Sequence, residues 1–188
     1  MKKVLFLILA SIILLGLAGQ GTSGFFGDTE ASAGSTFTAW EITSVTLLDD
    51  GFEGSPWDAN WDGNGTTDWQ HVDSQTHSGS WAAGCTSGDT YLTTDNLDAS
   101  GVSSITVSFW FYIKDLNKGP LYLQIYNGSS YNNWYDLFAY PGAVKNTWFY
   151  FSETITDSQY FRSDFHLRFD GSGSSTNTYL DDVLITSE

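Results

Sequence analysis

The chain is short of basic residues and has a single cysteine, and both shortages limit its function. Seven Lys and Arg residues stand against 22 Asp and Glu, which gives the 188-residue chain a formal net charge of −15 at pH 7. Such an acidic surface repels phosphate backbones and anionic lipid heads, so we expect no nucleic-acid binding and no binding to a membrane surface. Divalent cations, neutral sugars or a high-salt environment are all compatible with it. Cys85 cannot form an intrachain disulfide, and its strand-like surroundings predict a small buried thiol.

Catalytic motifs are also lacking. The chain has three histidines and contains neither H-E-x-x-H nor G-x-S-x-G. Its many carboxylates would allow a glycosidase pair in principle, but the sequence distinguishes no two of them from the rest. We therefore predict that the protein is not an enzyme.

The one long hydrophobic run lies at the N-terminus. Lys2 and Lys3 precede an apolar run over residues 4–18, and small residues follow up to Gly24. This pattern predicts a signal peptide over residues 1–24 and an extracellular or cell-surface protein. The run has about 15 residues, which is short for a bilayer span of about 20. Retention of the run as a membrane anchor is the alternative.

The segment after the hydrophobic run contains G-T-S-G-F-F-G-D-T-E, followed by G-S-T-F-T-A at residues 34–39. It resembles the N-terminus of camelysin-like and biofilm-fibre precursors. The resemblance implies cleavage after Gly24, export, and surface assembly rather than protease activity. In some such fibres the freed segment pairs with the sheet of the next subunit. Here residues 25–40 form either such an arm or a flexible spacer rich in Gly, Ser, Thr and Ala.

From residue 41 onward, short alternating runs replace any sustained helical periodicity. In the clearest run, residues 104–113, alternate apolar side chains share one face and should form the centre of the core. These side chains are Ile105, Val107, Phe109, Phe111 and Ile113. We predict about nine strands, over residues 45–48, 78–86, 90–94, 104–113, 121–126, 134–140, 148–152, 165–169 and 179–186. The pattern predicts an all-β, two-sheet antiparallel jelly-roll sandwich over residues 41–188.

Several short motifs follow one another through this region. They are D-G-F-E at 50–53, H-S-G-S-W at 77–81, V-S-F-W-F-Y at 107–112, L-R-F at 167–169 and L-D-D-V at 180–183. In this order they resemble MAM-type domains and related jelly-roll carbohydrate-binding modules. The disulfide cysteines of MAM domains are absent, so bacterial or archaeal surface modules are the better match. The resemblance implies a concanavalin-like or galactose-binding-like jelly roll that serves in extracellular adhesion or glycan binding.

One acidic segment, residues 49–53, follows the first predicted strand, and a second, residues 181–182, lies in the last; we expect them to meet where these strands pair. Calcium requires six to eight oxygen ligands. The resemblance implies a structural calcium between the first strand, the loop at residues 77–80 and the last strand. The alternative is a turn with solvated acids. The candidate ligands are Asp50, Glu53, Asp181 and Asp182.

A second acidic pattern, D-A-N-W-D-G at residues 58–63, matches the opening of an EF-hand calcium loop. Trp69 stands at position twelve, where the closing glutamate is expected. We therefore interpret residues 58–64 as a polar loop.

Residues 129–136 gather aromatic and amide side chains that suit sugar binding, because aromatic rings stack on the C–H faces of sugars. We predict Tyr131, Asn133 and Trp134 as ligand contacts, with core packing of the aromatics as the alternative. The sequence thus predicts a non-catalytic module that binds a polysaccharide or a glycoprotein glycan. The alternative is a structural subunit of a surface fibre or extracellular matrix, which would bind neighbouring subunits through residues 25–40.

Overall fold

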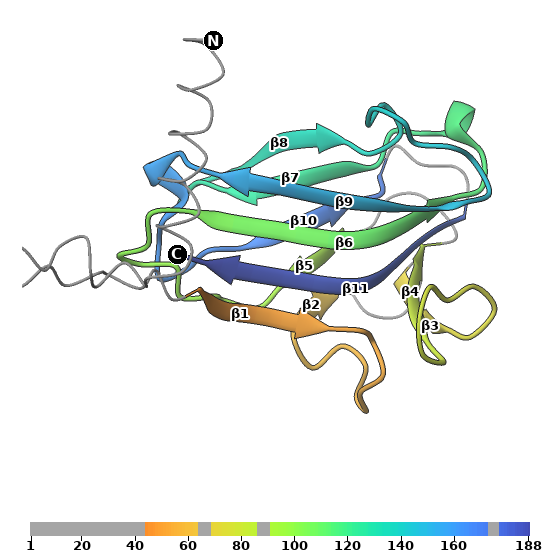
Figure 1. Cartoon of the computed structure of the whole chain (residues 1–188), viewed down its shortest axis with the longest axis horizontal. Helices are drawn as coiled ribbons and strands as arrows, with labels where there is room; N and C mark the ends of the chain where they lie inside the picture. Colours follow the sequence, from red (N-terminus) through yellow and green to blue (C-terminus); the bar gives the residue numbers. More distant parts are fainter. Residues whose placement is uncertain (1–43, 64–68, 86–90, 173–176) are drawn as a thin grey trace, which may run out of the picture. The chain divides into compact units, whose positions relative to one another are not determined.

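The alternating runs form the strands of a β-sandwich in the computed structural model (Figure 1), which describes residues 44–63, 69–85, 91–172 and 177–188. These residues all belong to one compact unit, Ile42–Glu188. The predicted signal peptide and the arm at residues 25–40 lie outside the described residues. No helix within the described ranges is long and apolar enough to cross a membrane.

Eleven strands and two short 3-10 helices make up the described part of the chain. They are β1 (Val45–Asp50), β2 (Trp61–Gly63), β3 (Trp69–Val72), β4 (Ala82–Cys85), β5 (Tyr91–Thr94), β6 (Ile105–Ile113), η2 (Leu116–Lys118), β7 (Tyr122–Tyr126), β8 (Tyr131–Asp136), β9 (Trp148–Ile155), η3 (Ser158–Tyr160), β10 (Leu167–Asp170) and β11 (Thr178–Ser187).

The strands build two antiparallel sheets (Figure 1). The six-stranded sheet has the order β3-β4-β11-β6-β9, with β1 also paired to β11, and the five-stranded sheet has the order β2-β5-β10-β7-β8. This arrangement confirms the predicted all-β, two-sheet antiparallel jelly-roll sandwich.

Most predicted strands are present, but some boundaries were wrong. β2 and β3 were missed because W-D-G has only three residues and W-Q-H-V does not alternate apolar with polar residues. The strand predicted over 78–86 begins only at Ala82, since the preceding residues form a loop whose N–H groups bind carboxylates. The strand predicted over 134–140 lies instead at Tyr131–Asp136, and a turn follows it.

The core lies between the sheets and is centred on β6, as predicted. Ile105, Val107, Phe109, Phe111 and Ile113 are at most 2% exposed. Each such side chain stabilises the fold by about 1.5–3 kcal/mol on burial. The Phe109 ring stacks on Phe151 of the same sheet and meets Phe169 of the other sheet edge-on, at centroid distances of 4.6 and 5.0 Å. Cys85 is buried, which confirms its predicted position in the interior.

The first and last strands pair, so the two acidic segments meet as predicted. Asp49 and Asp50 lie opposite Leu184 and Val183. The register between β11 and β6 shifts just after Asp181, and Asp182 has a φ of 50°. Such a bulge redirects side chains at a strand end. Asp181 and Asp182 therefore point towards the loop at residues 77–81 instead of continuing the alternation of β11.

Candidate functional site

The four predicted metal ligands lie at this junction, which we call the acidic seam (Asp50, Glu53, Asp181 and Asp182). Asp50, the last residue of β1, stabilises the segment that leads from β1 to β2. Its carboxylate accepts hydrogen bonds from the Phe52 N–H at 2.8 Å and the Trp61 indole N–H at 2.8 Å. The Asn60 amide donates a third, at 3.1 Å. Asp50 therefore holds the Phe52 backbone at its φ of 59° while the Phe52 ring enters the core.

Glu53 binds the loop at residues 77–81 from one side. Its Oε1 accepts the N–H groups of Ser80 and Trp81, both at 2.8 Å. Gly79 has a φ of +54°, and a Cβ atom there would lie 2.3 Å from Glu53 Oε1. Only glycine allows both this backbone conformation and so close an approach of the carboxylate.

Asp181 and Asp182 bind the same loop from β11. Buried Asp181 accepts the N–H groups of His77 at 2.8 Å, Ser78 at 3.1 Å and Asp182 at 2.8 Å. Burial raises the pKa of the Asp181 carboxyl, and the N–H groups of Ser78 and His77 partly offset this rise. Asp182 accepts the Ser78 hydroxyl at 2.6 Å and His77 Nδ1–H at 2.7 Å. The His77 ring also stacks on Trp110, with centroids 3.9 Å apart.

The oxygen atoms of the seam fit calcium only in part. Within the described ranges, no three His, Cys, Asp or Glu side chains form a group that could hold a metal ion. Asp50 and Asp181 each already accept three hydrogen bonds. Glu53 and Asp182 are thus the carboxylates best placed to bind an ion. Backbone carbonyls would have to supply the other ligands that calcium needs.

The D-A-N-W-D-G pattern forms a turn that leads into β2. The Trp61 N–H donates to the Asp58 carbonyl at 3.0 Å, the Asn60 amide donates to Asp50, and Asp62 lies in β2. Asn64 lies outside the described residues. The described residues of this pattern thus form a turn, and two of them, Asn60 and Trp61, donate hydrogen bonds to Asp50.

A second cluster lies on the outer face of the five-stranded sheet. The guanidinium carbon of Arg168 on β10 lies 3.5 Å from the ring centroid of Tyr131 on β8 and 4.2 Å from that of Tyr91 on β5. The charge is therefore held between two aromatic rings, and such contacts contribute about 0.5–2 kcal/mol each. Burial raises the pKa of the Tyr131 phenol, although the Arg168 charge acts in the opposite direction.

A buried amide connects Arg168 to the polar residues around it. Gln124 on β7 is 7% exposed, and its Oε1 accepts a hydrogen bond from Arg168 Nε at 2.7 Å. Its Nε2 donates to Asn133 Oδ1 at 2.7 Å and to Asp170 Oδ2 at 3.0 Å. We call these residues together the tyrosine–arginine face: Tyr91, Gln124, Tyr131, Asn133, Arg168 and Asp170.

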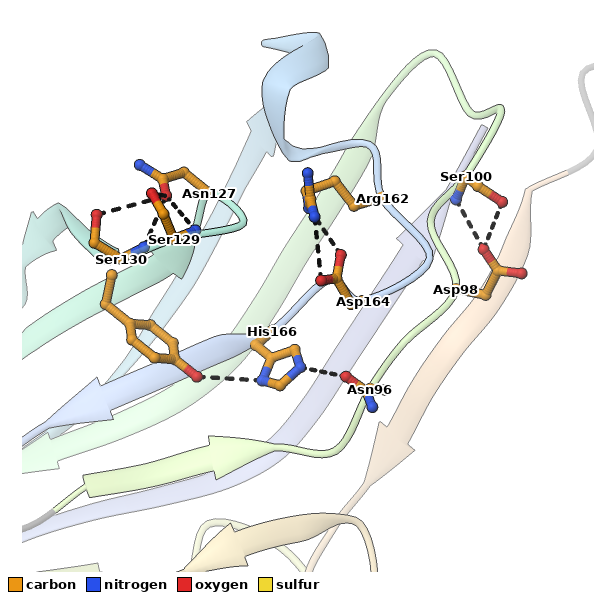
Figure 2. A network of polar contacts seen from close by, with 10 residues as sticks. Asn96, Asp98, Ser100, Asn127, Ser129, Ser130, Arg162, Asp164 and His166 are labelled. Carbon is orange, nitrogen blue, oxygen red and sulfur yellow. Dashed lines mark hydrogen bonds and ion pairs between the residues drawn. The ribbon is translucent and has the colours of Figure 1, made fainter.

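Tyr131 is held at its hydroxyl, and a side chain orders the turn just before it. The hydroxyl lies 3.2 Å from His166 Nδ1, and Figure 2 shows the other ring nitrogen of His166 pointing to Asn96, whose Oδ1 accepts a hydrogen bond from it. His166 Nδ1 is therefore the acceptor and the Tyr131 hydroxyl the donor. At the turn before β8, the Asn127 side chain accepts the N–H groups of Ser129 and Ser130 (Figure 2). The tyrosine is thus fixed before any ligand binds.

The three predicted ligand contacts do not all lie together. The structure brings Tyr131 and Asn133 to the tyrosine–arginine face. Trp134 lies where the β7–β8 register shifts; it packs against the core, with its ring meeting Phe151 edge-on at 5.8 Å. The alternation of β8 already places Trp134 on the opposite side from Asn133, and this signal was available in the sequence.

Sequence reasoning missed Tyr91, Gln124, Arg168 and Asp170. Alternation in their strands would have placed each on an outward face, but not next to one another. A shallow cleft of about 300 Å³ lies further along the sheet, at the start of β7 and the end of β8. Its lining includes Tyr122 and Asp136, which pair across β7 and β8, and Pro120.

No protein-family model matches this sequence, and a search of curated proteins found no match. Solved structures do match. The chain is similar to the CBM22-1 xylan-binding domain of Xyn10C from Paenibacillus barcinonensis, with a TM-score of 0.52 and 14% identity over 77% of this chain and 95% of that one. It is also similar to the C-terminal family 22 carbohydrate binding module of Clostridium thermocellum Xyn10B, with a TM-score of 0.53 and 14% identity over 76% of this chain and 92% of that one.

The class that these observations define is a β-sandwich with the fold of family 22 carbohydrate-binding modules. A further xylan-binding domain of that family has a TM-score of 0.53 and 14% identity over 76% of this chain and 94% of that one. At this identity the likeness shows the fold alone.

Proposed function

We propose that the protein is a non-catalytic glycan-binding module, secreted or displayed on the cell surface, whose tyrosine–arginine face contacts the glycan. The observation that carries the proposal is the Arg168 guanidinium held between Tyr91 and Tyr131 beside a hydrogen-bonded amide network. Aromatic rings present flat apolar area for the C–H faces of a sugar, and fixed polar groups orient its hydroxyls. The fold shared with xylan-binding domains supports the same interpretation.

The tyrosine–arginine face suits a ligand that binds without large rearrangement. Tyr131 is held at its hydroxyl by His166, and Asn133 is held at its Oδ1 by Gln124. Side chains that are already ordered lose less conformational entropy when the ligand binds. A polysaccharide chain lying across β7 would extend from these residues towards the cleft at Tyr122.

Affinity electrophoresis of the full chain in gels containing soluble polysaccharides, xylan among them, tests the proposal. We expect retardation by at least one polysaccharide and a loss of about tenfold in affinity for Tyr131→Ala, since a stacked aromatic contributes about 0.5–1.5 kcal/mol beyond its buried area. Tyr150→Ala is the matched control, because Tyr150 is 48% exposed on the other sheet. Equal affinity of the two variants, or no retardation by any polysaccharide, would overturn the proposal.

We also propose a structural calcium at Glu53 and Asp182, which bind the same loop from the segment after β1 and from β11. A bound ion would link the segment after the first strand to the last strand. Glu53 and Asp182 would supply its carboxylate ligands, and its effect would be on stability.

A further inference from the structure

Arg168 determines which groups of the tyrosine–arginine face donate hydrogen bonds and which accept them. A guanidinium only donates, so the Gln124 atom that faces Arg168 Nε is the amide oxygen. The Gln124 nitrogen therefore faces Asn133 and Asp170 and donates to both. Asn133 must accept through Oδ1, and its Nδ2 is left to point away from Gln124. Because Asn133 is exposed, this N–H pair is available to a ligand.

The acceptors of the same network are turned inward. Asp170 is 8% exposed, and its two oxygens accept from Gln124 Nε2 at 3.0 Å and from the Ser172 N–H at 2.9 Å. Gln124 Oε1 and Asn133 Oδ1 are likewise occupied within the network. The network therefore leaves donors uncommitted: the terminal nitrogens of Arg168 and Nδ2 of Asn133 take no part in its hydrogen bonds.

Arg168 has no carboxylate partner within ion-pair distance among the described residues. The ion pairs found there join His77 to Asp182 and Arg162 to Asp164. The guanidinium carbon lies 4.2 Å from the ring centroid of Tyr91 and 3.5 Å from that of Tyr131, and Nε is bonded to Gln124, so a ligand would reach the terminal nitrogens. Arginine binds a carboxylate in the plane of its guanidinium, where two N–H groups donate two parallel hydrogen bonds.

We propose that the tyrosine–arginine face recognises a sugar carboxylate, as in the uronic acid units of a polysaccharide; this proposal rests on the glycan-binding function proposed above. The chain carries a net charge of −15, and exposed Asp62 lies on the neighbouring strand β2. A polymer charged at every unit would be repelled by this surface. The ligand therefore has isolated carboxylates on an otherwise neutral backbone, so that one carboxylate meets Arg168 and Asn133.

A matched pair of polymers tests the proposal: glucuronoxylan, and the same glucuronoxylan with its carboxyl groups chemically reduced to alcohols. Affinity electrophoresis of the full chain should show about tenfold tighter binding of the carboxylated polymer, since hydrogen bonds to charged groups contribute more than neutral ones. Asn133→Asp keeps the acceptor for Gln124 but turns a negative oxygen outward. We expect this variant, and Arg168→Gln, to lose the preference for the carboxylated polymer.

Arg162→Gln is the matched control, because it removes an arginine that is paired with Asp164 (Figure 2) and is not one of the residues of the tyrosine–arginine face. It should keep the preference of the wild type. Equal binding of the two polymers by the wild type would overturn the carboxylate proposal and leave glycan binding standing. A preference that survives in both Asn133→Asp and Arg168→Gln would also overturn it. Binding of neither polymer, nor of any other polysaccharide, would overturn both proposals.

Discussion

Replacing Asp50 by alanine removes the acceptor of three hydrogen bonds, and the cost can be worked out from the partners left behind. The Trp61 indole N–H and the Phe52 N–H belong to buried residues, so neither gains water easily when the carboxylate is lost. An unsatisfied buried donor costs about 1–3 kcal/mol. The exposed Asn60 amide can turn to solvent and adds little. We expect Asp50→Ala to lower the free energy of unfolding by about 3 kcal/mol.

Urea unfolding followed by tryptophan fluorescence measures this loss directly. For a chain of this size, about 3 kcal/mol corresponds to a fall in Tm of about 6–12 °C. Asp49→Ala is the matched control, because Asp49 is the exposed neighbour on β1 and the variant loses the same charge. It should change the stability by at most about 0.5 kcal/mol. If the two variants unfold alike, with EDTA present to exclude metal effects, the hydrogen-bond reasoning fails.

Two further predictions concern the acidic seam. Because burial raises the pKa of Asp181 above 3.8, the folded protein binds this proton more tightly than the unfolded chain, so this group contributes more stability as the pH falls from neutral towards 3.8. Urea unfolding from pH 7 down to about 4 should therefore show wild type gaining stability relative to Asp181→Asn; a relative loss would contradict this. For calcium, chelation should lower the Tm measured by scanning calorimetry, and Glu53→Ala should abolish that response. Melting that is independent of calcium would end the calcium proposal.

Strand periodicity allowed much of the fold to be predicted. Alternate apolar residues from Ile105 to Ile113 identified the core strand, since a period of two leaves no other way to bury them together. The acidic segments at the first and last strands also met as expected. The short strands β2 and β3 gave no such signal, because W-D-G has only three residues and W-Q-H-V does not alternate.

The candidate site was only partly predictable. Tyr131 and Asn133 were found because they lie in one polar aromatic segment. Arg168 and Gln124 were not, because no short segment holds them together; they lie 44 residues apart and meet through the pairing of β10 with β7. For Trp134, by contrast, the alternation of β8 was enough to place its side chain opposite Asn133, where it packs against the core.

By itself the sequence determined the acidity of the chain, the lack of catalytic motifs, the sandwich class and the residues that must be buried, because these depend on composition and local periodicity. Strand order, the bulge of β11 and the direction of the Gln124 hydrogen bonds were decided only by the tertiary structure. The physical reason is that each depends on which strands become neighbours. Alternation predicts which face of the sheet a side chain occupies, whereas only the assembled sheet shows which other side chains lie beside it on that face.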